Sequence, residues 1–296
     1  GIFIGLGRLK RLRLQYNRLT VIPGEAFTGL SKVDGFQIQH NRLISLPSDA
    51  FKDMGYVTNF DLSYNLLATL PSEIFNAFAK VVSLFLNDNQ LVSLPDEIFA
   101  NMTFLVFLNM SNNNLTNLFP HTFASLHELV FLNLSLNKLE SLPSFEQLIS
   151  VEILDLTSNE LEFVRHDTFT DTLTLKFLSL DDNKISELPD NVFDGLRRLQ
   201  ILYLRKNLLA YMKPGLFNSL NQLVLLKISF NRLSMLDTDV FWGLANLQNL
   251  DLQYNNIVNL PISAFNNLTN LQFVNMSYNS LQQIESEDIR DIPLDL

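Results

Sequence analysis

Histidine and cysteine, the side chains most often used for metal binding and nucleophilic chemistry, are scarce in this 296-residue chain, which has four His and no Cys. His121 and His127 are six residues apart, a spacing that matches no usual pattern of metal ligands. The other two histidines are isolated at His40 and His166. Because the chain has no cysteine, a thiolate ligand, a disulfide and a Cys nucleophile are excluded. The sequence therefore predicts no metal site and no cofactor.

Neighbouring carboxylates could suggest general acid–base catalysis. Asp181 and Asp182 are adjacent, and Asp155 precedes them in a related sequence context. The chain has no Gly-rich phosphate loop, and its pattern suggests no grouping of Ser, His and acid residues for nucleophilic catalysis. We interpret these acids as solvated surface and predict that the chain is not an enzyme.

The composition of the chain limits the classes of partner that it can bind. A net charge of −10 and a pI near 4.8 disfavour nucleic acid and anionic membranes, which call for clustered Lys and Arg. No stretch approaches the roughly 20 apolar residues that span a bilayer. With 47% hydrophobic residues the chain can bury a core. We therefore expect a folded protein with no membrane insertion by this segment.

An internal repeat must position these side chains. Asparagine recurs every 24 residues, with a single step of 22, at Asn17, Asn41, Asn65, Asn89, Asn113, Asn137, Asn159, Asn183, Asn207, Asn231, Asn255 and Asn279. Counted from each Asn, apolar residues recur at −8, −5, −3, +2 and +5, followed by Phe at +10 and Leu at +13. A fixed period of this length indicates a solenoid.

Each part of the repeat has a physical interpretation. Alternating apolar and polar residues before the Asn predict a short strand, and stacked repeats would join such strands into a parallel sheet. The Asn amide can donate and accept hydrogen bonds, so it can satisfy backbone groups buried at the turn after the strand. On the return side we expect a stack of rings from Phe27, Phe51, Phe75, Phe99, Phe123, Phe169, Phe193, Phe217, Phe241 and Phe265.

Segments such as "LQNLDLQYNNIVNLPISAFNNL" (247–268) and "LQILYLRKNLLAYMKPGLFNSL" (199–220) resemble the 24-residue, Phe-type leucine-rich repeat of animal extracellular proteins. Slit, Toll and Toll-like receptors, chaoptin and small proteoglycans share this repeat. The resemblance implies an α/β-type repeat solenoid, a leucine-rich repeat horseshoe of about twelve repeats. Its parallel sheet would be concave and its convex side irregular or short-helical.

The repeat also predicts the domain organisation. We expect one leucine-rich repeat domain over residues 1–296, in which residues 1–8 form the convex tail of a truncated repeat. Residues 285–296 would be a worn last repeat or a lead-out, and the chain would be a fragment of a longer ectodomain. The 22-residue step places Phe145 at +8, which indicates either a tolerated deletion or a local change of curvature.

The outward strand positions contain the candidate binding residues. At −6 from the Asn, repeats five to ten form an apolar column of Phe107, Phe131, Ile153, Phe177, Ile201 and Leu225. Such a column would be either an interaction site or a shield for the sheet. At −1 lie amphipathic aromatic residues, which favour interfaces. We predict a protein ligand on repeats seven to ten, contacting Asp155, Phe177, Asp181, Asp182, Tyr203, Arg205, Lys206, Lys227, Phe230 and Tyr254.

Six sequons offer candidate glycosylation sites, at Asn101, Asn109, Asn114, Asn133, Asn267 and Asn275. Asn109 and Asn133 occupy the same outward column, so glycans there would cover the sheet at repeats five and six. Chance alone gives a similar number of sequons, so their presence does not settle the compartment.

We therefore predict a non-catalytic protein-binding module of an extracellular or cell-surface receptor, adhesion or innate-immune protein. Its partner would be a protein ligand or co-receptor, a homodimer is left open, and any membrane anchor would lie elsewhere in a longer chain. A secreted repeat protein acting on its own fits equally well. The alternative is a cytoplasmic leucine-rich repeat scaffold in signalling, which the absence of cysteine favours but the long Phe-type repeat does not.

Overall fold

The structure is a computed structural model that describes residues 2–261 and 264–283. Its contacts divide the chain into two compact units. Unit 1 comprises Gly1–Leu139 with Gln147–Val151, and unit 2 comprises Glu140–Glu146 with Glu152–Leu296. The predicted lead-out at 285–296 lies outside the described residues. A single domain over the whole chain stays a prediction.

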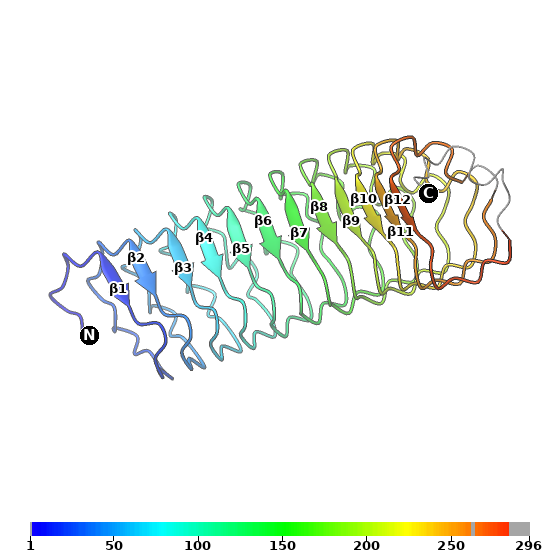
Figure 1. The fold of residues 1–296 in the computed structure, drawn as a ribbon. Helices are drawn as coiled ribbons and strands as arrows, with labels where there is room; N and C mark the ends of the chain where they lie inside the picture. The colour runs from blue at the N-terminus through cyan, green and yellow to red at the C-terminus, as the bar shows by residue number, and fades with distance from the viewer. Residues whose placement is uncertain (1, 262–263, 284–296) are drawn as a thin grey trace. The chain divides into compact units, whose positions relative to one another are not determined.

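Six short parallel strands form the sheet of unit 1. They lie side by side in chain order, with the return segments on the opposite side of the coils (Figure 1). Their bounds are β1 Arg11–Arg13, β2 Gly35–Gln37, β3 Asn59–Asp61, β4 Ser83–Phe85, β5 Phe107–Asn109 and β6 Phe131–Asn133. The middle residue of β2 to β6 is buried and its two neighbours face solvent at least in part, which confirms the predicted alternation.

Unit 2 repeats this arrangement with six more parallel strands. Their bounds are β7 Ile153–Asp155, β8 Phe177–Ser179, β9 Ile201–Tyr203, β10 Leu225–Lys227, β11 Asn249–Asp251 and β12 Phe273–Asn275. The register advances by one repeat per strand, as in the pairing of Leu202 with Leu226. The side of each sheet that carries the outward residues is called its strand face below.

The repeated Asn acts as predicted, as a link between coils. Asn65 Nδ2 donates to the carbonyls of Leu62 (3.1 Å) in its own coil and Ile38 (3.4 Å) in the preceding one. Its Oδ1 accepts from the Leu43 N–H at 3.0 Å. Asn183 forms the same set in unit 2. Each amide thus satisfies backbone groups that the stacked coils remove from water.

A left-handed residue precedes every one of these Asn residues. All twelve have φ between 51° and 57°, and none is glycine. This conformation costs about 1–2 kcal/mol for a residue with a Cβ, so the surrounding coil must impose it. The turn directs the following Asn side chain inward and sends the −1 side chain out beside the sheet.

The predicted Phe stack fills the return side of both units. Phe75 and Phe99 lie 6.0 Å apart between ring centroids in unit 1, and Phe193 and Phe217 lie 6.2 Å apart in unit 2. Phe145, from the 22-residue step, still stacks on Phe169 at 6.3 Å. The shortened return segment therefore keeps its ring within the core.

The return segments contain turns, and no helix occurs in residues 2–261 and 264–283, so the short-helical part of the fold prediction is not confirmed. Isolated bonds close these turns, such as Ala26 N–H to the Pro23 carbonyl at 2.9 Å. These bonds do not form the continuous run that propagates a helix, so the segments stay as turns.

Candidate protein-binding face

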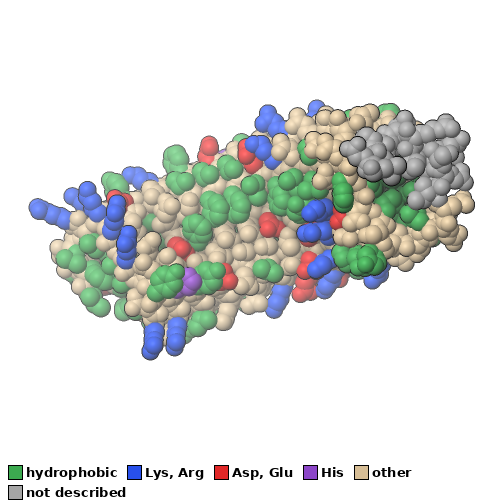
Figure 2. Space-filling view, viewed as in Figure 1, with side chains coloured by type: hydrophobic (Ala, Val, Ile, Leu, Met, Phe, Trp, Pro, Cys, Tyr) green, Lys and Arg blue, Asp and Glu red, His purple; other side chains and the backbone are tan. Residues whose placement is uncertain are grey.

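A cluster on the strand face of unit 2 is centred on Tyr203, at the end of β9. Phe177 from β8 meets the Tyr203 ring edge-on, with 5.4 Å between centroids. Two cations lie over the same ring: the Arg205 guanidinium at 5.1 Å from its centroid and the Lys227 ammonium at 4.9 Å. Figure 2 shows hydrophobic side chains over β7 and β8 next to Lys and Arg over β9 and β10. We call Phe177, Tyr203, Arg205 and Lys227 the Tyr203 cluster.

An ion pair fixes one member of this cluster. The Asp181 carboxylate accepts from Arg205 Nη2 at 2.6 Å, Arg205 Nε at 2.7 Å and the Arg205 backbone N–H at 2.6 Å. The Asp181 side chain is 5% exposed and that of Arg205 40%. The sequence placed these residues in opposed patches facing a partner, whereas the structure binds them to each other. Arg205 therefore orients the cluster more than it offers an unpaired charge.

Burial and pairing act in opposite directions on the Asp181 carboxyl. Burial raises its pKa above the usual range, and the contacts with Arg205 counteract part of that rise. The hydrogen bond from Arg205 to Asp181 in turn raises the pKa of the guanidinium, which stays charged. Removing Arg205 would leave a buried carboxyl whose charge has lost its main partner.

The remaining acids of the predicted contact set each have hydrogen-bond partners of their own. Asp182, next to the buried Asp181, is exposed and accepts from Ser158 Oγ at 2.7 Å. Asp155 Oδ1 accepts from the Thr157 N–H at 3.0 Å, where it caps the turn after β7. The two neighbouring carboxyls have separate partners and different burial.

The −1 column forms an aromatic stack beside each sheet. In unit 2, Phe230 lies 4.4 Å from Tyr254, which lies 4.1 Å from Tyr278. The hydrogen bond between the two tyrosines raises the pKa of Tyr254. Phe230 and Tyr254 were predicted as contact residues, and Tyr278 extends their stack. Lys206 occupies the preceding position of the column and is exposed.

Unit 1 has a matching stack that the sequence indicated only as a column. His40 lies between Tyr16, at 4.4 Å, and Tyr64, at 4.2 Å. Asp88 follows in the same column, and its negative charge raises the pKa of Tyr64. The regular spacing of aromatic residues at −1 was the available signal. The sequence pattern did not predict the left-handed turn that brings successive rings face to face.

The apolar −6 column is half-buried in both units. Phe107 and Phe131 stack at 4.3 Å with an interplanar angle of 4°, and Phe85 meets Phe107 at 5.0 Å. Figure 2 shows the hydrophobic side chains gathered over β4 to β6. Part of this column therefore shields the unit 1 sheet, while the rest stays accessible to a partner.

The six sequons differ in accessibility. Asn101 is exposed, and the other five Asn residues are half-buried. Asn109 and Asn133 end β5 and β6, where each Oδ1 accepts from the N–H two residues later, at 3.1 and 2.9 Å. N-glycosylation attaches the sugar at Nδ2, so these Oδ1 bonds are compatible with a glycan on either residue.

Sequence comparison identifies the family. The leucine rich repeat family matches residues 1–43, 35–91, 79–139, 149–209, 197–257 and 245–294. This chain is a leucine-rich repeat protein. Its Asn links, parallel strands and Phe stack are the structural form of that repeat. A search among curated proteins finds no match.

Solved structures share the fold over nearly the whole chain. The Leptospira interrogans LRR protein LIC12759 is 30% identical, with a TM-score of 0.80 over 96% of this chain and 71% of that protein. Glycosylated Drosophila Toll, in its complex with Spatzle, is 25% identical, with a TM-score of 0.81 over 96% of this chain and 46% of Toll. This leucine-rich repeat chain therefore spans less than half the length of the Toll chain it matches.

A third solved structure bears on the kind of ligand. TLR13 in complex with ssRNA13 is 23% identical, with a TM-score of 0.65 over 97% of this chain and 54% of TLR13. At this identity the likeness shows the fold alone. The fold itself thus leaves the ligand class open, and the side chains on its surface determine which ligand can bind.

Proposed function

We propose that this leucine-rich repeat chain is a non-catalytic recognition module of a receptor, adhesion or immune protein at the cell surface or outside the cell. Its ligand is a protein, which it binds on the strand face of unit 2. The observation that carries this proposal is the Tyr203 cluster, in which one half-buried aromatic ring contacts Phe177 and two cations.

Several properties of the cluster suit a protein interface. Tyr and Arg supply both apolar area and hydrogen bonds and are enriched where binding energy concentrates. Arg205 is already held by Asp181, so binding would immobilise fewer free side chains. Phe230 and Tyr254 are 40% and 39% exposed and extend the apolar area at the edge of this sheet.

Nucleic acid is disfavoured as the ligand by the net charge of −10. Across the described residues no helix is long and apolar enough to cross a bilayer. Protein binding by Toll, whose structure contains Spatzle, supports the proposed ligand class by analogy.

A cytoplasmic scaffold is the second candidate, and two observations favour it. The chain has no cysteine, which suits a reducing compartment. Its two sequons on the strand face, Asn109 and Asn133, are half-buried, so their side chains are less open to a glycan than the exposed Asn101. Secretion from eukaryotic cells followed by peptide mapping separates the candidates: an extracellular protein is exported with a glycan at Asn101, whereas failure of export supports the scaffold.

The binding proposal is tested with a panel of secreted and cell-surface ectodomains, probed with the chain by biolayer interferometry. A ligand that uses this face should bind Tyr203→Ala and Lys227→Glu at least tenfold more weakly than wild type. The double variant Arg197→Ala/Arg198→Ala removes two exposed cations elsewhere in unit 2 and is the matched control. Ligands that bind all variants equally would refute the proposed face.

A further inference from the structure

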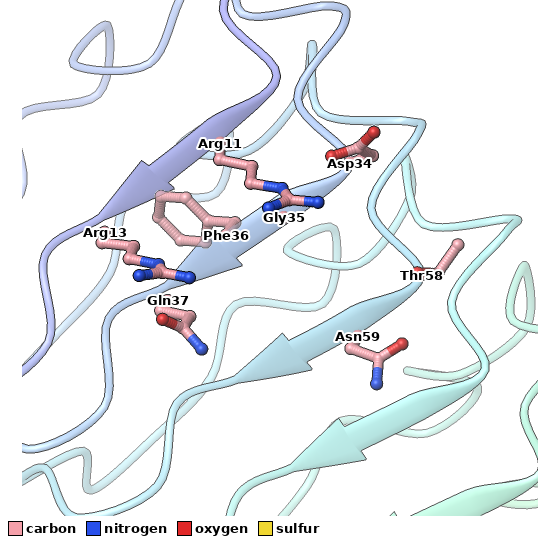
Figure 3. Close-up of a pocket in the computed structure, with 8 residues that line it drawn as sticks. All are labelled: Arg11, Arg13, Asp34, Gly35, Phe36, Gln37, Thr58 and Asn59. Atoms are coloured by element: carbon pink, nitrogen blue, oxygen red, sulfur yellow. The ribbon is translucent and has the colours of Figure 1, made fainter.

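A second candidate site lies on the strand face of unit 1, at β1 to β3. A hollow of about 530 Å³ is lined there by Arg11, Arg13, Asp34, Gly35, Phe36, Gln37, Thr58 and Asn59. Figure 3 shows the Arg11 side chain extending across Gly35 and the Arg13 side chain extending toward Gln37, with Asn59 on the next strand, β3. The hollow belongs to unit 1 and does not depend on the face proposed for unit 2.

The hollow exists because of the −6 column. Where repeats five to ten carry Phe, Ile or Leu, the first four carry Arg11, Gly35, Asn59 and Ser83. A Cβ at Gly35 would lie 3.2 Å from Arg11 Cγ, so even the smallest side chain would press on the arginine. With hydrogen at this position, a ligand can reach the sheet itself.

The N-terminal part of the chain is positively charged, whereas the whole chain has a negative net charge. Arg8, Lys10, Arg11, Arg13 and Arg18 precede the first acid, Glu25, although the chain carries a net charge of −10. Arg11 and Arg13 are exposed, and neither forms an ion pair with any residue that the structure describes. Asp34 is the one carboxylate in the lining, so the lining carries an excess of one positive charge.

The geometry of the two arginines indicates the shape of the anion. Arg11 and Arg13 are two apart on one strand, so they leave the same face about 7 Å from each other. Carboxylates two apart on an extended peptide have the same separation. Each guanidinium can grip one carboxylate through two hydrogen bonds, and the amides of Gln37 and Asn59 can donate to the peptide carbonyls.

We propose that this hollow binds an extended acidic peptide segment of a partner protein, with carboxylates at positions i and i+2. The segment lies along β1 and β2, and its two acids meet Arg11 and Arg13. Gly35 provides the space for its backbone. We call this arrangement the paired-arginine site.

The test uses the full chain and fluorescein-labelled peptides followed by fluorescence anisotropy. The probe GAEAEAG should bind, and its neutral analogue GAQAQAG should bind at least tenfold more weakly. GEAAAEG, with the same charge but a wider spacing, should lose at least threefold. Raising NaCl from 50 to 500 mM should strongly weaken binding of the probe, because salt screens the attraction between exposed charges.

Variants assign the binding to the hollow. Arg11→Ala/Arg13→Ala should weaken the probe at least tenfold, and Arg197→Ala/Arg198→Ala, which removes the same charge from unit 2, should leave it unchanged. Gly35→Ile should fill the hollow and displace the Arg11 side chain, and both effects should weaken binding of the probe, by at least fivefold in total. Ile153 and Ile201 occupy the same −6 position in unit 2, so the fold accepts an isoleucine there. Circular dichroism melts confirm that each variant is folded.

Several results would overturn the proposal. Equal binding of the glutamine analogue would remove the role of carboxylates, and equal binding to Arg11→Ala/Arg13→Ala would remove the site. A heparin oligosaccharide that binds through these arginines while GAEAEAG does not would replace the acidic peptide with a sulfated glycan.

Discussion

Arginines on the two strand faces serve different purposes. In unit 1, Arg11 and Arg13 are exposed beside a hollow and have no ion-pair partner among the described residues. In unit 2, Arg205 is held by three hydrogen bonds to the buried Asp181 and lies over Tyr203. The same residue type is available to a ligand in one unit and part of the scaffold in the other.

This difference shows how repeats that share one backbone structure can form different surface sites. The Asn links and the left-handed turn are the same in both units, so they fix where an outward side chain starts. The neighbour one repeat away then decides its role. Gly35 leaves space beside Arg11, whereas Asp181 neutralises Arg205.

Replacing the linking Asn tests whether its hydrogen bonds stabilise the two units to the same extent. This change has the largest expected effect on stability. Asn65→Ala in unit 1 and Asn183→Ala in unit 2 each leave three carbonyls and one N–H without their amide partner. We expect each to lower the free energy of unfolding by about 2–4 kcal/mol, measured by urea denaturation.

Asn17→Ala is the control for the Asn link, since the exposed Asn17 donates only within its own coil, to Leu14 and Gln15. It should cost less than about 1 kcal/mol. A loss at Asn65 much smaller than at Asn183 would show that the two frames differ, which would weaken the comparison of their faces.

Removing Arg205 tests its structural role directly. Arg205→Ala leaves the Asp181 carboxylate buried without its cation, so we expect a loss of about 1–3 kcal/mol at pH 7. Arg13→Ala, on the exposed Arg13 of unit 1, should change stability by less than about 0.5 kcal/mol. Equal effects of the two substitutions would contradict the contrast between the units.

The loss in Arg205→Ala should depend on pH. Because burial raises the pKa of Asp181 in the folded state, the neutral carboxyl is favoured there, and removing Arg205 raises this pKa further. A raised folded pKa gives stability that is present at low pH and lost as pH rises through it. The deficit should therefore shrink toward about pH 4. Urea denaturation of wild type and variant at both pH values measures it.

The smallest effect concerns the left-handed turn itself. Leu136 has φ 55° in unit 1 and is 53% exposed, so its side chain contributes little packing to offset the strain. Asn tolerates this conformation better, and Leu136→Asn should raise the free energy of unfolding by about 0.5–1 kcal/mol in urea denaturation. Destabilisation would show that the Leu136 side chain packs more usefully than its exposure indicates.

The frame was readable from the sequence because it repeats. The spacing of Asn, Leu and Phe predicted the strands, the Asn links and the ring stack, which are all confirmed. The short-helical convex side was not confirmed, since it depended on the resemblance alone, and the return segments form separate turns.

The sites were less accessible to sequence reasoning, because they depend on contacts between columns. Asp181 and Arg205 lie in the same outward column, but only the structure shows that Asp181 is buried and forms an ion pair with Arg205. The hollow at Gly35 could have been noticed as the small residues at −6 in the first repeats. The rings of Tyr16, His40 and Tyr64 stack face to face because of the left-handed backbone turn at each residue. The residue types in the column do not predict this turn.

The most direct test of the central claim is amide hydrogen–deuterium exchange on the chain alone and with a protein ligand found in the ectodomain panel. Exchange maps the bound surface without any substitution. Binding through the Tyr203 cluster should slow exchange in peptides that cover β9 and β10, at residues 199–208 and 223–232. Protection confined to the return segments, with these strands unchanged, would contradict recognition by the Tyr203 cluster.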